Sequence, residues 1–165
     1  MSRVEGVHRK PGARSAAVLV ACGGLVLAFG LLVAMADRPP WHAALMPAAA
    51  ALAGGPFFGP LGQWLPSFVH PFAFSLFTAA AWPPGPSSAY RACAAWWAVN
   101  VIFEVAQQPA IAAAVAGGLE AAFGRNALTR SLANYLLRGT FDVGDLVAAT
   151  AGALAAAGVL FIVRH

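Results

Sequence analysis

The sequence predicts an all-α integral membrane protein with about four transmembrane helices, and three observations carry that prediction. Of its 165 residues, 60% are hydrophobic and only 10% are charged, whereas a soluble domain carries roughly 25% charged residues. The mean hydropathy of +0.71 shows that the apolar excess is general. Several apolar runs also approach the length of about 20 residues that a helix needs to cross a bilayer. A water-soluble fold is therefore excluded, and residues 1–165 are expected to form a single transmembrane domain.

Four runs predict the spans, which in chain order are 16–36, 65–82, 88–107 and 140–163. The first is rich in Leu and Val, the third contains two tryptophans, and the fourth is rich in Ala. The second contains Pro66 and Pro71 but is otherwise rich in Phe. A proline near the start of a span is tolerated, because the N–H groups of the first helical turn have no intrahelical partner to lose.

Two further segments are apolar without predicting a straight span. Residues 43–60 are interrupted by several prolines and glycines, which favours a re-entrant or interfacial segment. Residues 109–138 begin as an Ala-rich, helical stretch and become polar near Gly124. This second segment is expected to lie along the membrane interface as an amphipathic loop helix.

The basic residues predict the orientation of the chain. With four spans, six Lys and Arg residues fall on the side of the N-terminus and four on the opposite side. The six are Arg3, Arg9, Lys10, Arg14, Arg91 and Arg164, and the four are Arg38, Arg125, Arg130 and Arg138. Residues 1–15 form a basic tail next to the first span, and Lys and Arg close to a span favour the cytoplasm. Both termini are therefore predicted to be cytoplasmic.

The placement of basic residues and cysteines disfavours two other classes of function. A net charge of +4 would suit nucleic acid, but outside the tail the basic residues are single and are not interleaved with aromatic residues as in a single-strand groove. Cys22 and Cys93 lie inside apolar runs, where a thiol packs as a small hydrophobe. Nucleic-acid binding, a disulfide and a cysteine metal site are therefore not expected.

Seven polar side chains interrupt or border the apolar runs, and the sequence places them in one half of the membrane. They are His70, Asn100, Glu104, Gln107, Arg138, Asp142 and Asp145. A charged residue in hydrocarbon costs roughly 2.5 to 3.5 kcal/mol, so each one needs a reason. Glu104 lies roughly 24 Å along the third span, and His70 roughly 8 Å down the second. Because consecutive spans alternate in direction, all seven fall in the half that the predicted orientation makes extracytoplasmic.

Helical spacing groups these residues further. The three polar residues of the third span are three or four positions apart, so they share one stripe. Asp142 and Asp145 share a face at the start of the fourth span, where a carboxylate caps free backbone N–H groups. One interpretation is an interhelical clamp in which Arg138 pairs with Asp142 or Glu104. The other is a water-filled pocket that binds a polar head group or passes a proton, with raised pKa values for its buried acids.

The sequence does not predict a reaction. Acids and a histidine are present, but no arrangement identifies a nucleophile, a base and an electrophile. A metal site built from His70, Glu104, Asp142 and Asp145 is conceivable by ligand type, although nothing in the spacing is diagnostic. Neither a metal nor a cofactor is expected.

The order of the polar motifs points to a family. Residues 103–107 read Phe-Glu-Val-Ala-Gln, and residues 138–145 read Arg-Gly-Thr-Phe-Asp-Val-Gly-Asp, followed by Gly152. This order resembles the VanZ-like integral membrane proteins, whose pattern is Glu-x-x-Gln, a loop, then Arg, Phe-Asp, a second Asp and a later Gly. His70 sits where that family often has a histidine opening its second span. The resemblance covers roughly residues 64–158 and departs from the family at Ala149, where an Asn is usual.

The resemblance implies a small bacterial cell-envelope protein of the inner membrane, in a family linked to lipoglycopeptide resistance and without an agreed biochemical activity. The departure at Ala149 favours a general role in envelope lipids over resistance. Two hypotheses follow. In the first, the seven polar residues hold an anionic or glycosylated lipid head group, with Arg138 facing phosphate. In the second, the chain is an accessory or structural subunit of a larger membrane complex, or a homo-oligomer, and its polar residues are structural.

Overall fold

The protein is all-α, as the sequence predicts. The computed structural model describes residues 13–37, 58–82 and 86–164, and within these ranges it contains six helices and no strand. The helices are α1 (Ala13–Asp37), α4 (Gly59–Ala81), α5 (Pro86–Ala106), α6 (Pro109–Phe123), α7 (Ala127–Arg138) and α8 (Val143–Arg164).

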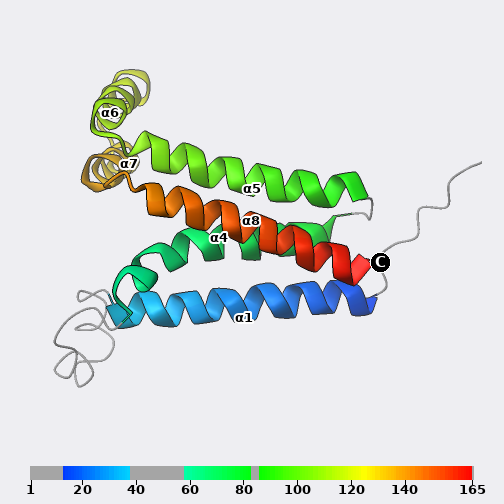
Figure 1. Cartoon of the computed structure of the whole chain (residues 1–165). Helices are drawn as coiled ribbons and strands as arrows, with labels where there is room; N and C mark the ends of the chain where they lie inside the picture. The colour runs from blue at the N-terminus through cyan, green and yellow to red at the C-terminus, as the bar shows by residue number, and fades with distance from the viewer. Residues whose placement is uncertain (1–12, 38–57, 83–85, 165) are drawn as a thin grey trace, which may run out of the picture.

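Four helices pack into a bundle, and α6 and α7 lie at one end of it (Figure 1). α4 is the central helix, because it packs against α1, α5 and α8. α5 also packs against α8, whereas α6 packs mainly against α7. Successive bundle helices alternate in direction, so α1 ends, α4 begins, α5 ends and α8 begins at the end of the bundle that carries α6 and α7.

The core of the bundle consists of small and aliphatic side chains at helical spacing. The buried face of α8 carries Ala149, Ala153, Ala156 and Leu160. The buried face of α4 carries Val69, Phe72, Ala73, Leu76 and Ala79. Intervals of three and four residues place each set on one side of its helix. Cys93 of α5 is buried in the same core, so its thiol packs as a small apolar side chain, as the sequence predicts.

Two helices are long and apolar enough to cross a membrane, over Arg14–Asp37 and Val143–Val163. A third candidate exists if the pair formed by Ala89–Ala106 and Pro109–Phe123, which is bent by 97°, is counted as one broken span. Helices of this length and apolar composition are expected of a membrane protein. The last of them begins at Val143, three residues after the predicted start, because Asp142 occupies the capping position in front of α8.

α4 begins earlier than the sequence predicts, at Gly59 in place of residue 65. Gly59 adopts a positive φ of 56°, Pro60 lies in the first turn, and the Asp37 carboxylate at the end of α1, distant in the chain, accepts the Phe58 N–H at 3.0 Å. Most of the predicted re-entrant segment 43–60 lies outside the described residues. Its last three residues lead into and begin α4 and are therefore not part of a separate segment.

The predicted loop helix over 109–138 is two helices. The break falls at Gly124, which has a positive φ of 72°. α7 then starts with a reciprocal cap, in which the Asn126 side chain accepts the Thr129 N–H at 2.9 Å and the Thr129 hydroxyl accepts the Asn126 N–H at 3.0 Å. α7 is strongly amphipathic: it packs Ala133 and Leu136 inward and carries its polar side chains on another face.

Candidate functional site

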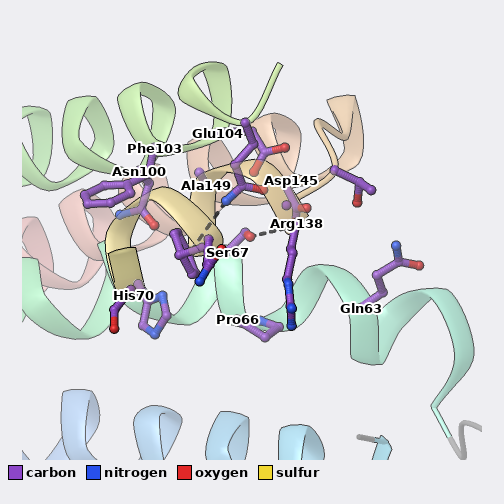
Figure 2. A pocket seen from close by; sticks show the side chains of 16 residues that line it. Gln63, Pro66, Ser67, His70, Asn100, Phe103, Glu104, Arg138, Asp145 and Ala149 are labelled. Carbon is purple, nitrogen blue, oxygen red and sulfur yellow. Dashed lines mark hydrogen bonds between the residues drawn. The ribbon is translucent and has the colours of Figure 1, made fainter. Parts of the chain in front are cut away.

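A pocket of about 660 Å³ lies where α4, α5, α7 and α8 meet, at the end of the bundle near α6 (Figure 2). α4 contributes Gln63, Pro66, Ser67 and His70; α5 contributes Asn100, Phe103, Glu104 and Gln107; and α7 contributes Ser131, Asn134, Tyr135 and Arg138. Gly139, Thr140, Asp145 and Ala149 complete the lining. On each of the three helices the residues follow the same spacing, i, i+3, i+4 and i+7, which defines one face of a helix.

Six of the seven predicted polar residues line this pocket. They are His70, Asn100, Glu104, Gln107, Arg138 and Asp145. Asp142 does not line it but caps α8 immediately behind the pocket wall. The sequence therefore predicts correctly that these residues come together, whereas their role in binding stays a prediction.

Glu104 holds the connection between α7 and α8 against α5. Its side chain is buried, with 9% of its surface exposed, and its carboxylate Oε1 accepts the backbone N–H of Asp142 at 2.6 Å. A side chain at Gly139 would overlap the side chain of Gln107, so this position lets the connection approach α5 closely. Glu104 therefore contributes to the wall of the pocket and to its assembly.

Asp142 is the N-cap of α8 and joins it to α4. One carboxylate oxygen accepts the Gly144 N–H at 2.7 Å, and the other accepts the indole N–H of Trp64 at 2.9 Å. The Trp64 indole and then the Gly144 N–H hold the pKa of Asp142 below its usual range, since both stabilise the ionised form, while partial burial opposes them.

The predicted pairing of Arg138 with Asp142 or Glu104 is wrong. Among the residues that the structure describes, the ion pair formed is Arg125 with Glu120, at 2.8 Å on the surface. The two acids predicted as partners of Arg138 are instead occupied by backbone N–H groups and an indole. In the described part of the chain, these hydrogen bonds tie the helices together and no buried ion pair is formed.

A third tie crosses the pocket from α4 to α8. The Ser67 hydroxyl donates to the Asp145 carboxylate at 2.6 Å, and both side chains are partly buried. Figure 2 shows this bond at the centre of the pocket, between α4 and the start of α8. Both pocket acids, Glu104 and Asp145, therefore already accept a hydrogen bond from within the chain.

Other pocket groups keep their hydrogen-bonding capacity. Within the described ranges, neither the guanidinium of Arg138 nor the imidazole of His70 bonds another residue, and both side chains are exposed. In Figure 2, Arg138 extends from the end of α7 towards α4. The Asn100 amide donates one N–H to the Trp96 carbonyl at 2.8 Å, which leaves its second N–H available. These three side chains are the pocket groups best placed to bind a ligand.

Several pocket residues were not found by sequence reasoning. α4 adds Gln63 and Ser67, one of which lies before the predicted start of its span, and α7 adds Ser131, Asn134 and Tyr135. The spacing of Gln63, Ser67 and His70 is itself a signal of a shared face, once the helix is known to begin at Gly59. In the described part of the chain, no three His, Cys, Asp or Glu residues are grouped to hold a metal ion.

We expect Trp64→Phe to weaken the fold slightly at neutral pH and to have no such effect in strong acid. The indole lowers the pKa of Asp142 in the folded state, so its contribution is complete above the unfolded-state pKa and is lost as the pH falls through the folded-state pKa. The measurement is unfolding in detergent across that acid range.

Trp97→Phe is the matched control for this variant. The Trp97 indole donates to the Thr150 hydroxyl at 3.0 Å, and a hydroxyl does not titrate over this pH range. The effect of Trp97→Phe should therefore be independent of pH. If the loss of stability in Trp64→Phe is also independent of pH, the Trp64 indole does not stabilise the ionised carboxylate of Asp142.

Comparison with known proteins adds no relative: no family model, no curated protein and no solved structure matches this chain. Any function must therefore be argued from the pocket.

Proposed function

We propose that this chain is a four-span, VanZ-like protein of the bacterial inner membrane whose pocket binds the anionic head group of a membrane lipid. The observation that carries the proposal is the exposed guanidinium of Arg138, which has no partner among the described residues and lies in a pocket half of whose lining residues carry an amide or a hydroxyl.

The packing of α4 and α5 supports the proposed four-span arrangement. α4 has 23 residues and α5 has 21, lengths of roughly 34 and 31 Å, enough to cross a bilayer core. α4 lies between α1 and α8, both of which are apolar enough to span a membrane. The polar pocket then lies in the leaflet where α1 ends, which is extracytoplasmic if the N-terminus is cytoplasmic.

A lipid fits this position better than a soluble ligand. The pocket is formed by faces of α4 and α5 that would lie within the membrane. Its lining includes exposed side chains, those of Gln63, His70 and Phe103, and buried ones, those of Glu104 and Ala149. Polar side chains exposed to hydrocarbon are costly. The polar part of a lipid, held between the two helices, would satisfy them while its chains remain in the bilayer.

The Arg138 guanidinium is the group that would attract an anion, in a lining that also contains the carboxylates of Glu104 and Asp145. A guanidinium presents five N–H donors in a planar fork that matches a phosphate oxygen pair. Glu104 and Asp145 are nearby acids, but each already accepts a hydrogen bond from the chain. The neutral amides of Gln63 and Asn134 add further donors. A phosphate group of either a glycerophospholipid or an isoprenoid-linked lipid has this chemistry.

The test is native mass spectrometry of the protein released from nanodiscs that contain anionic phospholipid. Arg138→Ala should reduce retained phospholipid at least about tenfold, the size of one hydrogen bond to a charged group. Arg138→Lys should retain part of the binding, because it keeps the charge and loses the fork. Arg130→Ala is the matched control, since Arg130 is on the same helix, is exposed, and lies outside the pocket lining.

Equal lipid retention by Arg138→Ala and Arg130→Ala would contradict lipid binding at the pocket. Stoichiometric protein partners that remain bound in both variants would instead favour an accessory subunit of a larger membrane complex. In that case the polar network would serve only to hold the helices together.

A further inference from the structure

The pocket has a second polar end, deeper in the bundle than Arg138. His70 is the twelfth of the 23 residues of α4, close to the middle of that helix. It lies about 10 Å along the helix from Gln63, and Asn100 lies about 10 Å along α5 from Gln107. Gln63 and Gln107 mark the outer end of the pocket, where α4 begins and α5 ends, so His70 and Asn100 mark its inner end.

The inner end offers neutral hydrogen-bond donors. The imidazole of His70 stacks on Phe74, with ring centroids 6.0 Å apart, and it bonds no other described residue. An imidazole carries an N–H in either protonation state. Asn100 directs one amide N–H to the Trp96 carbonyl and keeps the other. Both side chains therefore present donors to a group that accepts hydrogen bonds.

Aromatic rings close the pocket beyond this point. Phe74 of α4 stacks on Trp96 of α5, with centroids 4.8 Å apart, and the Trp96 indole is itself bonded to the Thr78 hydroxyl at 2.9 Å. Phe103 lines the pocket between its two ends and is 46% exposed. A ligand that reaches His70 therefore meets polar groups along the whole pocket and only apolar rings past it.

We propose that the pocket selects a glycerophospholipid, with its phosphate at Arg138 and its acyl ester carbonyls at His70 and Asn100. This inference rests on the function proposed above and names the ligand more narrowly. In a glycerophospholipid the ester carbonyls follow a few bonds below the phosphate, so a lipid with its phosphate at Arg138 directs these carbonyls towards the inner end of the pocket. In an isoprenoid phosphate only hydrocarbon follows the phosphate, which would leave the His70 and Asn100 donors unpaired, and unpaired polar side chains in hydrocarbon are costly.

The experiment compares three lipids in nanodiscs by native mass spectrometry. They are dioleoyl phosphatidylglycerol, its diether analogue with the same head group and chain length, and undecaprenyl phosphate. The wild-type protein should retain the diester lipid about 25-fold more than the diether lipid, the size of two neutral hydrogen bonds at about fivefold each. It should retain undecaprenyl phosphate less than the diester lipid.

His70→Phe is the informative variant, because it keeps a ring that stacks on Phe74 and removes the N–H. It should lower retention of the diester lipid about fivefold, the size of one neutral hydrogen bond, to a level still above that of the diether lipid, because Asn100 keeps its donor and binding still depends on Arg138. The comparison of lipids on the wild-type protein needs no variant, so it holds even if His70→Phe does not fold.

The outcomes separate this inference from the function on which it rests. Equal retention of the diester and diether lipids, or a preference for undecaprenyl phosphate, overturns the glycerophospholipid assignment while Arg138-dependent binding persists. If none of the three lipids is retained in an Arg138-dependent manner, the proposed function fails and this inference fails with it.

Discussion

Replacing Gly152 with alanine is expected to lower the free energy of unfolding by at least about 2 kcal/mol, the cost of forcing extra atoms into a well-packed core. A Cβ at this position of α8 would overlap the carbonyl group of Phe68 on α4, and it would lie 3.2 Å from the Phe68 Cα. The obstacle is backbone and no rotamer change relieves it. α8 would therefore have to move away from α4, against which it packs along the core of the bundle.

Gly158→Ala is the matched control on the same helix. A Cβ at Gly158 meets nothing within 4 Å, and alanine favours a helix over glycine by up to about 1 kcal/mol. This variant should be neutral or slightly stabilising. Unfolding of both variants in a mixed-detergent titration, followed by circular dichroism, measures the difference. If Gly152→Ala unfolds at the same detergent composition as Gly158→Ala, then α8 does not approach α4 closely at residue 152.

The same variant tests the connection between packing and the pocket. Gly152 lies one turn after Ala149, which is buried in the pocket floor. Moving α8 away from α4 would also separate Asp145 from Ser67, whose side chains meet at 2.6 Å. Gly152→Ala should therefore reduce lipid retention, although residue 152 does not line the pocket.

The sequence predicts that the polar residues come together, because this depends only on the positions of the helices in the chain and on their directions in the membrane. The apolar runs give the approximate helices, and consecutive spans alternate in direction. His70, Glu104 and Asp145 then fall at the same end of the bundle whichever way the chain is inserted. The structure brings these three residues to one pocket, since each lies on the pocket-lining face of α4, α5 or α8, and these helices pack against one another.

The start of α4 could not be predicted because a distant residue decides it. Locally, Gly59 and Pro60 follow a run of prolines and glycines that indicates an irregular segment. The helix nevertheless begins there, and the Asp37 carboxylate accepts the Phe58 N–H from 21 residues away. Gln63 was missed for this reason. The polar face of α7 was missed because nothing local shows that α7 folds back over the bundle.

The partner of Glu104 was predicted wrongly for a related reason. Sequence reasoning compares side chains, and Arg138 is the nearest cation in the chain to Asp142 and is predicted on the same side of the membrane as Glu104. The structure instead gives Glu104 a backbone donor, the Asp142 N–H. That N–H belongs to the residue in front of α8, where backbone donors have no helical acceptor. An unpaired N–H competes with a cation for a carboxylate, and the sequence does not show which is closer.

Replacing Glu104 with leucine should therefore destabilise the protein by about 1 to 3 kcal/mol, the cost of leaving a partly buried N–H without an acceptor. Glu104→Gln should be far milder, since an amide oxygen can accept the same N–H. Glu120→Leu is the surface control: Glu120 pairs with the exposed Arg125, and such pairs contribute little.

Detergent unfolding of the three variants, with lipid retention measured on those that fold, separates two roles of the Glu104 carboxylate. If Glu104→Gln folds and keeps its lipid, the acceptor is needed and the charge is not. If it folds and loses lipid, the negative charge contributes to the pocket itself. Equal stability of Glu104→Leu and Glu120→Leu would show that the bond to Asp142 does not hold the connection to α8, because only Glu104 makes that bond.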